Sequence, residues 1–418
     1  MSGSLNFKFR LFNRKPRFED EGSVYKIMYR KFLKNPLNVF FLIVLGIVTF
    51  IAVAGYLITP DSTPFANRQH LELALQKPGF QIQFLKIKKN VPVEKTGFFR
   101  KMILGKPDDS ELISIHKYEV IGDSVVAELF TGMSPNNGMT MRFHIVDVVA
   151  SVGIGTEIET SEKDYKYTNT SGENVEIAKN EAVNIFNNKF IVKQKFLLGT
   201  DGFGRDVLSQ LIIGARVSLA VGLVSVFLSL LVGVSLGAAA GFFGGRTDKV
   251  ILWIINVVWA IPTLFLVIAI TFALGKGFWQ IFIAVGLTLW VEIARLVRGL
   301  VMSIKNREYV EAAQALGFSN TRIIIHHILP ATLGPVIVVS AANFASAILI
   351  ESGLSFLGIG IQPPMPSWGV MLRENYGFLI MDYAYLAIIP GLAIMLLVLT
   401  FMVIGNGIRD AMEKRIEV

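Results

Sequence analysis

The sequence predicts an all-α polytopic membrane protein with six spans and one small β-rich insertion outside the membrane. Three observations predict this class: several long uncharged apolar runs, a composition of 52% hydrophobic and 17% charged residues, and a polar segment of domain size after the first run. Soluble domains hold about 45–50% apolar and about 25% charged residues. The composition therefore argues against a disordered chain and a soluble enzyme, and the lack of cysteine excludes disulfides and thiolate metal sites.

Six apolar runs carry the prediction of six spans, since a helix needs about 20 apolar residues to cross a bilayer. The runs are residues 39–58, 218–243, 250–275, 277–291, 331–350 and 385–404. One central charge costs about 2.5–3.5 kcal/mol on insertion scales, so long charge-free runs are not accidental. The first run exceeds the apolar segment of a secretory signal, and we expect it to be an uncleaved first transmembrane helix.

The distribution of Lys and Arg predicts which side of the membrane each segment occupies. Six spans put both termini on the same side of the membrane. We expect a protein of the cytoplasmic membrane with both termini in the cytoplasm. The inside segments are then 1–38, 244–249, 292–330 and 405–418. They hold 19 Lys/Arg and 10 Asp/Glu, against 21 and 22 elsewhere, which follows the positive-inside rule. The net charge of +8 thus reflects topology and gives no support to nucleic-acid binding.

Two polar regions flank the first span. Residues 1–38 form a basic cytoplasmic tail, whose Lys and Arg either contact anionic membrane lipid or only set the topology. Residues 59–197 are too long for a plain loop and form an extracytoplasmic inserted domain. Runs 124–131 and 139–146 predict two strands, and Asn137-Gly138 between them predicts a hairpin turn.

Glycine and proline mark special points within the predicted spans. Gly233, Gly237, Gly241 and Gly245 recur every four residues and form a small-residue face that allows another helix to approach closely. Pro262 interrupts the third span, where it removes a backbone hydrogen bond and is expected to kink the helix.

The segment between the fourth and fifth spans carries the most informative motif, EYVEAAQALG, which ends at Gly317. Its helix formers and three alanines predict a helix over 307–316, and Gly317 permits the positive φ that ends a helix. Ser319 or Asn320 can cap a second short helix, and Pro330 is expected to reset the chain direction before the fifth span. Two short helices at a sharp angle, with small residues on the first, can settle into a groove of another protein.

This segment resembles the EAA loop of ABC-importer permeases, whose pattern is E-A-A, three residues, G, nine residues, I-x-L-P. The matching residues are Glu311, Ala312, Ala313, Gly317, Leu329 and Pro330. His327 stands where the general pattern has Ile, although peptide permeases often carry a basic residue or His nearby. The resemblance implies a coupling loop over 299–330 in which these seven residues dock on an ATPase subunit.

Two further segments are similar to the C-type subunit of dipeptide and oligopeptide permeases. The first is LGTDGFGRD from Leu198, and the second is ESGLSFLG from Glu351, followed by SWG at 367–369. The similarity covers about residues 198–415 and implies the type I ABC importer transmembrane fold, with a permease core over 198–418. The family usually has a short loop where 59–197 lies, so the resemblance assigns no role to the insertion.

The first of these segments supplies the candidate interfacial residues Gly199, Asp201, Gly204, Arg205 and Asp206. Glycines and aspartates are also found in phosphate and calcium loops, but the Lys-[Ser/Thr] and the alternating ligands of such loops are missing. We therefore expect an interfacial turn that leads into the second span. No metal site is expected, because the five histidines are scattered.

Glu351 and Asn343, near the end of the fifth span, are the candidates for the substrate path. An ionisable residue within a membrane is a functional hypothesis by default. Glu351 could meet a substrate ammonium or a basic partner, or could snorkel to the headgroups as an ordinary surface carboxylate.

Taken together, the resemblances imply the permease subunit of an ATP-driven ABC importer that moves di- or oligopeptides. The chain contains no Gly-x-x-x-x-Gly-Lys-[Ser/Thr], so we expect no enzymatic activity and no cofactor in it, with ATP and Mg on two partner ATPase subunits. A homologous second permease and an extracytoplasmic substrate-binding protein are the other implied partners. A nickel or glutathione importer, a secondary transporter and a membrane-anchored receptor are the alternatives.

Overall fold

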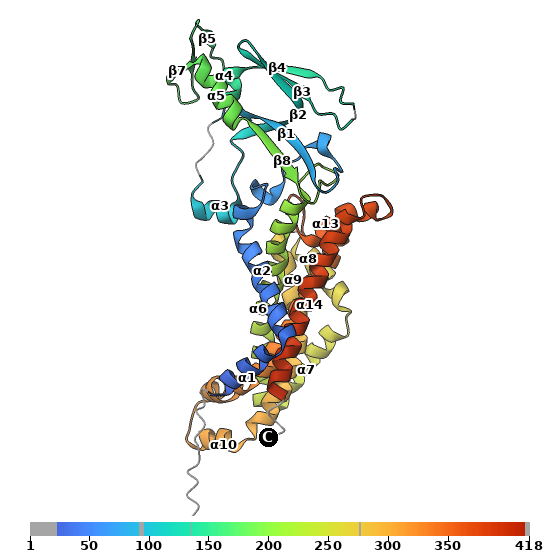
Figure 1. Cartoon of the computed structure of the whole chain (residues 1–418). Coiled ribbons are helices and arrows are strands. Elements are labelled where there is room, and N and C mark those ends of the chain that lie inside the picture. Colours follow the sequence, from blue (N-terminus) through green and yellow to red (C-terminus); the bar gives the residue numbers. More distant parts are fainter. Residues whose placement is uncertain (1–22, 92–95, 134, 276, 414–418) are drawn as a thin grey trace, which may run out of the picture.

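Apolar helices form an elongated bundle in the computed structural model, and a β-rich domain stands on one end of it (Figure 1). The structure describes residues 23–91, 96–133, 135–275 and 277–413. Residues 1–22 of the predicted basic tail lie outside the described residues. The helix α1, the end of α14 and α10 all lie at the end of the bundle opposite to the β-rich domain (Figure 1). The bundle helices are α1 (Ser23–Lys34), α2 (Pro36–Ile58), α6 (Val207–Phe243), α7 (Gly245–Trp259), α8 (Thr263–Leu274), α9 (Phe278–Lys305), α10 (Glu308–Ala315), α11 (Asn320–Ile323), α12 (Leu329–Phe356), α13 (Trp368–Asn375) and α14 (Tyr385–Glu413).

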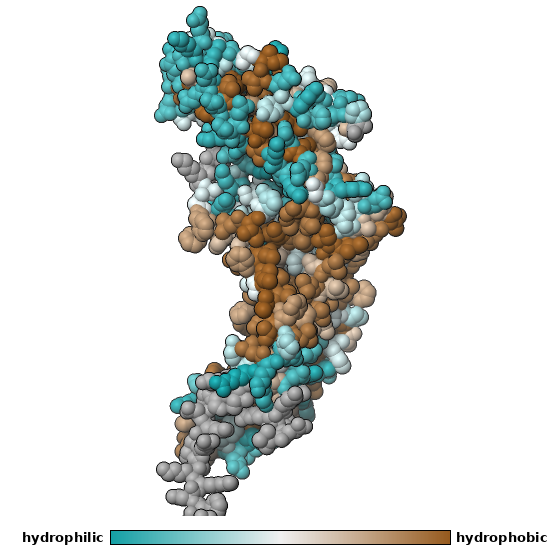
Figure 2. All heavy atoms as spheres, viewed as in Figure 1, coloured by the Kyte–Doolittle hydropathy of each residue, from teal (hydrophilic) through white to brown (hydrophobic). Residues whose placement is uncertain are grey.

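On the face shown in Figure 2, apolar side chains form a belt across the middle of the bundle, with hydrophilic surface above and below it. Within the described residues, five helices are long and apolar enough to cross a membrane, and α7 with α8 makes a sixth span if that bent pair is counted as one. The six predicted spans therefore correspond to these elements. The second span is longer than predicted, since α6 starts at Val207 rather than near residue 218.

The third span is broken rather than kinked. The axes of α7 and α8 meet at 95°. Pro262 has φ −55° and ψ 129°, an extended conformation directly before the first residue of α8. Proline has no N–H for the ladder, and its ring excludes the preceding turn. The predicted kink at Pro262 is confirmed in position and is larger than expected.

Helices α6 and α9 pack along the predicted glycine face. A methyl group on Gly233 would lie 2.8 Å from Ile293 Cβ, and one on Gly241 would lie 2.7 Å from the Arg298 carbonyl oxygen. Gly237 contacts α9 in the same way. These three glycines confirm the packing interpretation. Gly245 does not, because it is the first residue of α7, with φ +54° and open space around it.

The predicted β-rich insertion is confirmed and contains two antiparallel sheets. The larger sheet has the order β4-β3-β2-β1-β8 and the smaller has the order β5-β6-β7. Three short helices complete the domain: α3 (Phe98–Leu104), α4 (Ile145–Val149) and α5 (Lys179–Lys189). The strands are β1 (Phe80–Lys88), β2 (Ser110–Ile121), β3 (Ser124–Leu129), β4 (Thr140–His144), β5 (Glu159–Thr160), β6 (Asp164–Thr168), β7 (Asn174–Ala178) and β8 (Ile191–Phe196).

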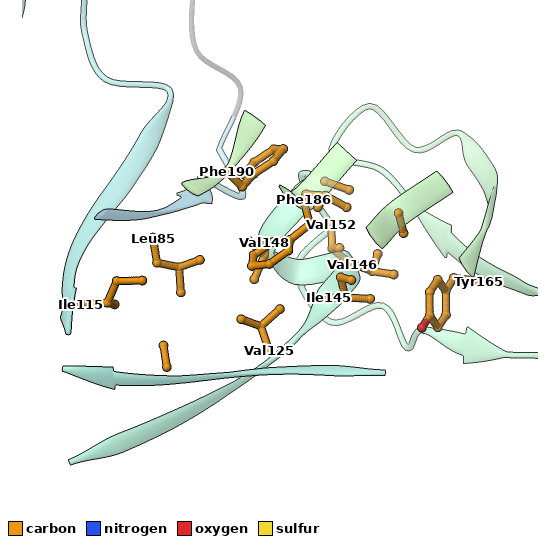
Figure 3. Packing of buried hydrophobic residues seen from close by; sticks show 14 residues of the cluster. Leu85, Ile115, Val125, Ile145, Val146, Val148, Val152, Tyr165, Phe186 and Phe190 are labelled. Atoms are coloured by element: carbon orange, nitrogen blue, oxygen red, sulfur yellow. The ribbon is translucent and has the colours of Figure 1, made fainter. Parts of the chain in front are cut away.

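A hydrophobic core joins α4 and α5 to one face of the larger sheet (Figure 3). Phe186 from α5 and Val148 from α4 are fully buried, and they belong to the same cluster as Leu85 of β1 and Val125 of β3. The domain thus has a core of its own, separate from the bundle.

The predicted hairpin is confirmed in its strands but wrong in its turn. β3 and β4 pair antiparallel, with Ser124 opposite His144 and Glu128 opposite Thr140. The connection runs from residue 130 to 139, longer than a two-residue Asn-Gly turn. Asn136 fills the turn role instead, since its Oδ1 accepts hydrogen bonds from the backbone N–H (2.9 Å) and hydroxyl (2.8 Å) of Thr131.

The chain enters and leaves the insertion at one place. β1 and β8 are adjacent antiparallel strands, with Phe80 opposite Phe196. The backbone N–H of Gly79 donates to the Phe196 carbonyl at 2.8 Å. Residues 59–78, before this point, contact both the bundle and the insertion, so the predicted boundary at residue 59 stays a prediction.

Candidate functional site

Helix α10 forms the exposed loop between the fourth and fifth spans. Arg307 has extended dihedrals (φ −87°, ψ 144°) and starts the helix at Glu308. Gly317 ends it with φ +75°, and its N–H donates to the Gln314 carbonyl at 2.9 Å. A positive φ directly after a helix is the usual position for glycine. The predicted helix and its terminating glycine are both confirmed.

One face of α10 anchors the loop to the bundle. Val310 and Ala313, three residues apart, are buried and share a cluster with Val301 of α9 and Ile323 of α11. The other faces are exposed and carry small, acidic and two larger apolar side chains. These exposed residues are Glu308, Tyr309, Glu311, Ala312, Gln314, Ala315 and Leu316. The arrangement gives a small-residue surface on a helix whose buried face packs against α9 and α11.

The prediction of a second separate helix, with a change of direction at Pro330, is wrong. Residues 320–356 form one continuous helix of 37 residues through a π-helical turn, Ile324–Ile328. In that turn the N–H of Leu329 donates to the Ile324 carbonyl, five residues earlier. Pro330 has no N–H to donate, and the wider π-helical turn directly before it accommodates the proline within the helix. Ser319 occupies the predicted cap position, but its side chain makes no capping hydrogen bond.

The predicted coupling residues occupy different environments. Glu311, Ala312, Gly317 and Pro330 are exposed, Ala313 is buried, and Leu329 is half-buried. His327 packs on Phe318, with ring centroids 5.8 Å apart. The buried Nδ1 of His327 has no hydrogen-bond partner within the described part of the chain. Only the exposed members can contact another protein, whereas the others hold the loop in place.

At the other end of the bundle, the predicted interfacial residues form a buried ion-pair cluster. The Arg205 guanidinium lies 2.7 Å from Asp201 and 2.6 Å from Glu374, and all three side chains are largely buried. The carboxylate of Asp201 also accepts the backbone N–H groups of Phe203 and Arg205, each at 2.9 Å. The turn thus joins the start of α6 to α13.

Two glycines bring this turn against the linker that follows α2. Gly199 and Gly204 have φ values of +76° and +69°. A methyl group on Gly204 would collide with the His70 carbonyl, and one on Gly199 would collide with the Gln76 carbonyl. We call this arrangement the outer lock: residues 199–206, linker residues 67–76 and Glu374. The turn leads directly into α6, and its interfacial role stays a prediction.

Asp206 caps α6 within the outer lock. Its carboxylate accepts the N–H of Ser209 at 3.0 Å and also the Ser209 hydroxyl. Burial raises the pKa of the Asp206 carboxyl above its ordinary value, although both hydrogen bonds from Ser209 oppose this. Ser209 in turn accepts the N–H of Asp61 at 3.0 Å, which ties the linker to α6.

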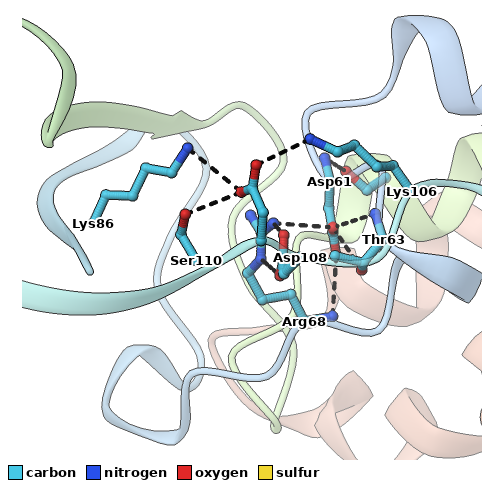
Figure 4. A network of polar contacts seen from close by, with 9 residues as sticks. Asp61, Thr63, Arg68, Lys86, Lys106, Asp108 and Ser110 are labelled. Atoms are coloured by element: carbon cyan, nitrogen blue, oxygen red, sulfur yellow. Dashed lines mark hydrogen bonds and ion pairs between the residues drawn. The ribbon is translucent and has the colours of Figure 1, made fainter. Parts of the chain in front are cut away.

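A polar network continues from this linker into the insertion (Figure 4). The carboxylate of Asp61 accepts the Thr63 hydroxyl at 2.7 Å and the Arg68 N–H at 3.0 Å. Arg68 makes a bidentate pair with Asp108, which follows α3. The linker therefore holds the bundle on one side and the insertion on the other.

Glu351 is fully buried, with an exposed fraction of 0%. Its carboxylate accepts hydrogen bonds from the hydroxyls of Ser355 (2.8 Å), Ser367 (2.9 Å) and Ser352 (3.4 Å). The interpretation of Glu351 as a carboxylate that snorkels to the headgroups is wrong, since these serines replace water. The motif residues after the fifth span thus meet as a structural cluster between α12 and α13.

Asn343 is also buried, and its amide donates to the Leu289 carbonyl of α9 at 3.3 Å. In this conformation neither Asn343 nor Glu351 borders an open passage, and a role of either in the substrate path stays a prediction. Within the described ranges, no group of three metal-ligating side chains lies close enough to hold an ion.

Two family profiles match the chain on either side of the insertion. Residues 233–418 match the binding-protein-dependent transport system inner membrane component, and residues 23–78 match the N-terminal TM domain of oligopeptide transport permease C. The oligopeptide transport system permease protein OppC of Bacillus subtilis is 38% identical over 218 residues, which cover 52% of this chain and 71% of that protein.

The chain belongs to this permease family. It is the transmembrane permease subunit of an ABC importer, with the type I importer fold and a β-rich insertion. The dipeptide permease protein DppC of Alkalihalophilus pseudofirmus is 42% identical to this permease, over 52% of this chain and 72% of the relative. The glutathione permease protein GsiD of Pectobacterium atrosepticum is 38% identical, over 53% and 73%.

The permease also resembles the MetNI methionine ABC transporter in an inward-facing conformation. The TM-score is 0.41 at 18% identity, over 49% of the permease and 97% of that chain.

The sequence did not reveal several residues of these sites. Glu374 and Gln76 lie far from the 199–206 turn in the chain, and no local pattern marks them as its partners. Similarly, Ser367 was noted as part of a motif but not as a ligand of Glu351. The profile match at 23–78 lies outside the region where the resemblance was found.

Proposed function

We propose that this permease imports di- or oligopeptides together with a homologous second permease, two ABC ATPase subunits and an extracytoplasmic substrate-binding protein. One observation carries the proposal: α10 presents a small acidic surface while Val310 and Ala313 fix it to the spans. Since the chain lacks a P-loop, the ATPase subunits would hold ATP and Mg and hydrolyse ATP. The names of the relatives OppC and DppC support peptides as the cargo.

In the proposed mechanism α10 acts as a rigid lever. Closure of the ATPase dimer displaces the exposed surface around Ala312, and the buried contacts of Val310 pass that displacement to α9 and α12. The bundle then alternates between inward- and outward-facing states. ATP and the loaded binding protein must each bind the outward-facing state more tightly, because a ligand with equal affinity for both states shifts neither.

The substitution Ala312→Arg tests the docking surface. A long cation on the small acidic face prevents close approach, so we expect loss of ATPase co-purification and of ATP-driven peptide uptake, with normal membrane insertion. Gln314→Arg is the matched control, since it adds the same side chain on the flank of the same helix. Full uptake by the Ala312 variant would remove α10 from the proposal.

A second test uses the turn that ends α10. Gly317→Val forces a β-branched residue into a positive φ, which costs about 1–3 kcal/mol, and should abolish coupling. Gly317→Asn should retain most uptake, since Asn tolerates this region. Gly299→Val is the control, because Gly299 lies within α9 with open space around it. Equal uptake by the Val variants at both positions would contradict the coupling role of the turn.

The cargo is tested by reconstitution with the partner subunits. Labelled peptide should accumulate only with ATP and binding protein, whereas transport of glutathione alone would favour the second candidate, which the relative GsiD supports. Nickel transport would favour the third. ATP-independent uptake by the chain alone would point to a secondary transporter.

The orientation proposed places α1, α10 and the end of α14 in the cytoplasm and the insertion outside. The excess of Lys/Arg on the α10 side supports it. The chain has no natural cysteine, so Ile154→Cys and Gln314→Cys can be labelled separately in intact cells. Only the Ile154 variant should react with an impermeant maleimide, and the reverse pattern would invert the topology.

For the insertion, we propose contact with the binding protein or with the second permease, on the basis of its size and position. Because Arg68, His70 and Gln76 belong to the outer lock, the deletion that tests this is 80–195, with a short linker between Gly79 and Phe196. Unchanged uptake and assembly after this deletion would refute the contact.

A further inference from the structure

Helix α3 of the insertion carries exposed apolar side chains beside the membrane belt. Phe98, Phe99, Ile103 and Leu104 have exposed fractions between 55% and 73%. The pairs Phe98/Met102 and Phe99/Ile103 are each four residues apart, so Phe98, Phe99, Ile103 and the half-buried Met102 share one side of the helix. The basic residues Arg100 and Lys101 lie on the remaining side. An exposed apolar surface of this kind, on a domain with its own core, marks a contact surface.

The position of α3 along the bundle is fixed by Arg216. The guanidinium of Arg216 donates to the carbonyls of Ile103 (2.7 Å) and Met102 (2.9 Å), at the C-terminal end of α3. Arg216 lies on the third turn of α6, roughly 13 Å from the start of that helix. A cation at the last carbonyls of a helix is also favourable to its dipole. These bonds place the C-terminal end of α3 beside the membrane-spanning helix α6.

A second set of contacts places α3 beside the last turn of α2. Gly105, which ends α3, packs so closely that a methyl group would lie 3.0 Å from the Tyr56 ring and 2.7 Å from the Ser62 carbonyl. Lys106 donates its N–H to the same carbonyl at 2.8 Å. Tyr56 belongs to the apolar helix α2, whose neighbouring residues Val53 and Leu57 are exposed.

The apolar surface of α3 is therefore continuous with the lipid-facing surface of α2. Figure 1 shows α3 beside the outer end of α2, below the sheets, and Figure 2 shows apolar residues there at the edge of the belt. We infer that α3 is an interfacial helix that inserts Phe98, Phe99 and Ile103 into the bilayer leaflet on the side of the insertion. Aromatic and aliphatic side chains on one side with Arg and Lys on the other are typical of helices at the headgroup boundary. The insertion is then held by lipid as well as by the outer lock.

The test uses single cysteines in the full-length chain, which has none of its own. Phe99→Cys and Ile103→Cys carry a bimane label, and the protein is reconstituted into phosphatidylcholine vesicles whose acyl chains are brominated or not. Leu57→Cys on α2 is the lipid-facing control. Ile154→Cys, at a position with an 88% exposed side chain in the insertion, is the aqueous control.

We expect brominated lipid to quench the labels at 99 and 103 by at least half as much as the label at 57, and to leave the label at 154 unchanged. Quenching of positions 99 and 103 by aqueous iodide, as at 154, would overturn the inference. Shielding from both quenchers would also overturn it, because a protein surface, such as that of a second permease, would then cover α3.

Discussion

The two ends of this molecule are built in opposite ways. At the outer lock, Arg205 is enclosed between Asp201 and Glu374, and two glycines at positive φ let backbones touch. At α10, only Val310 and Ala313 are buried, and the remaining surface is exposed. The difference shows that the side chains at one end pack against their own chain, whereas those at the other end leave a surface exposed. Substitutions should therefore damage folding at the outer lock and transport at α10.

The largest effect is expected for Gly204→Ala. The new methyl group would collide with the His70 carbonyl while the residue is held at φ +69°. Strain and collision together cost about 3 kcal/mol or more, and we expect loss of folded protein. Detergent-solubilised yield and thermal unfolding measure this.

Gly202→Ala is the matched control in the same turn, since its methyl group would lie 3.7 Å from Phe378, an ordinary contact. If both alanine variants were equally stable, the close approach at Gly204 would not hold the outer lock together.

The next effect is expected for Arg205→Met. This change leaves the buried carboxylates of Asp201 and Glu374 without their cation, and removal of one partner from a buried pair costs about 3–5 kcal/mol. The double variant with Glu374→Gln should recover part of this loss. Chemical denaturation of the full chain measures both, and purely additive losses would show that the two residues do not interact.

A smaller effect on stability, but a clear effect on transport, is expected for Val310→Ala. Loss of two buried methyl groups costs about 2 kcal/mol locally, which loosens α10 from α9. ATP hydrolysis by the assembled complex should then continue while peptide uptake falls.

Leu392→Ala is the control for this loss of coupling, because that side chain lies on α14, away from α10, and is 51% exposed. An unchanged ratio of peptide uptake to ATP hydrolysis in the Val310 variant would argue against a lever anchored at this residue.

The smallest effect is expected at Glu72, within the linker part of the outer lock. A hydrogen bond with His70, and another from the Ser114 hydroxyl at 2.6 Å, outweigh partial burial and lower the pKa of Glu72 to about 2. A carboxyl with a lowered pKa stabilises the fold above its unfolded pKa of about 4.5, and this stabilisation is lost as the pH falls toward 2. Glu72→Gln should flatten the fall in unfolding temperature between pH 5 and pH 3.

Because Glu72 is partly exposed, solvent screening limits this contribution to about 1 kcal/mol. Glu111→Gln, on an exposed position of the neighbouring strand, is the control. If the unfolding temperature of the Glu72 variant fell with pH as steeply as that of the unchanged protein, other carboxyls would be responsible for the fall.

Local patterns predicted the elements that depend on neighbours in the chain. The apolar runs predicted the spans, Pro262 predicted the break, and Gly317 predicted the end of α10. Each follows from composition or from backbone chemistry within one turn. The direction of the chain at Pro330 was not predictable in this way, because a π-helical turn absorbs the missing hydrogen bond without a change of direction.

Sites that depend on distant segments could be predicted only in part. The turn at 199–206 was recognised as interfacial, but its partners Gln76 and Glu374 come from α2's linker and from α13. For Glu351, the sequence identified an ionisable residue at the end of the fifth span, but not its burial or the three serines that bind it, one of which follows the helix. Contacts between distant segments leave no periodicity and no fixed spacing in a single sequence.

Because β1 and β8 are neighbouring strands, the two ends of the insertion lie side by side. Its first and last residues leave the linker and α6 side by side, with Gly79 bonded to Phe196, and the family profiles match the chain up to residue 78 and again from 233. A different domain with adjacent ends can be grafted at this junction without a change in the path of any transmembrane helix. The bundle therefore need not be rebuilt when the domain between its first and second spans is replaced.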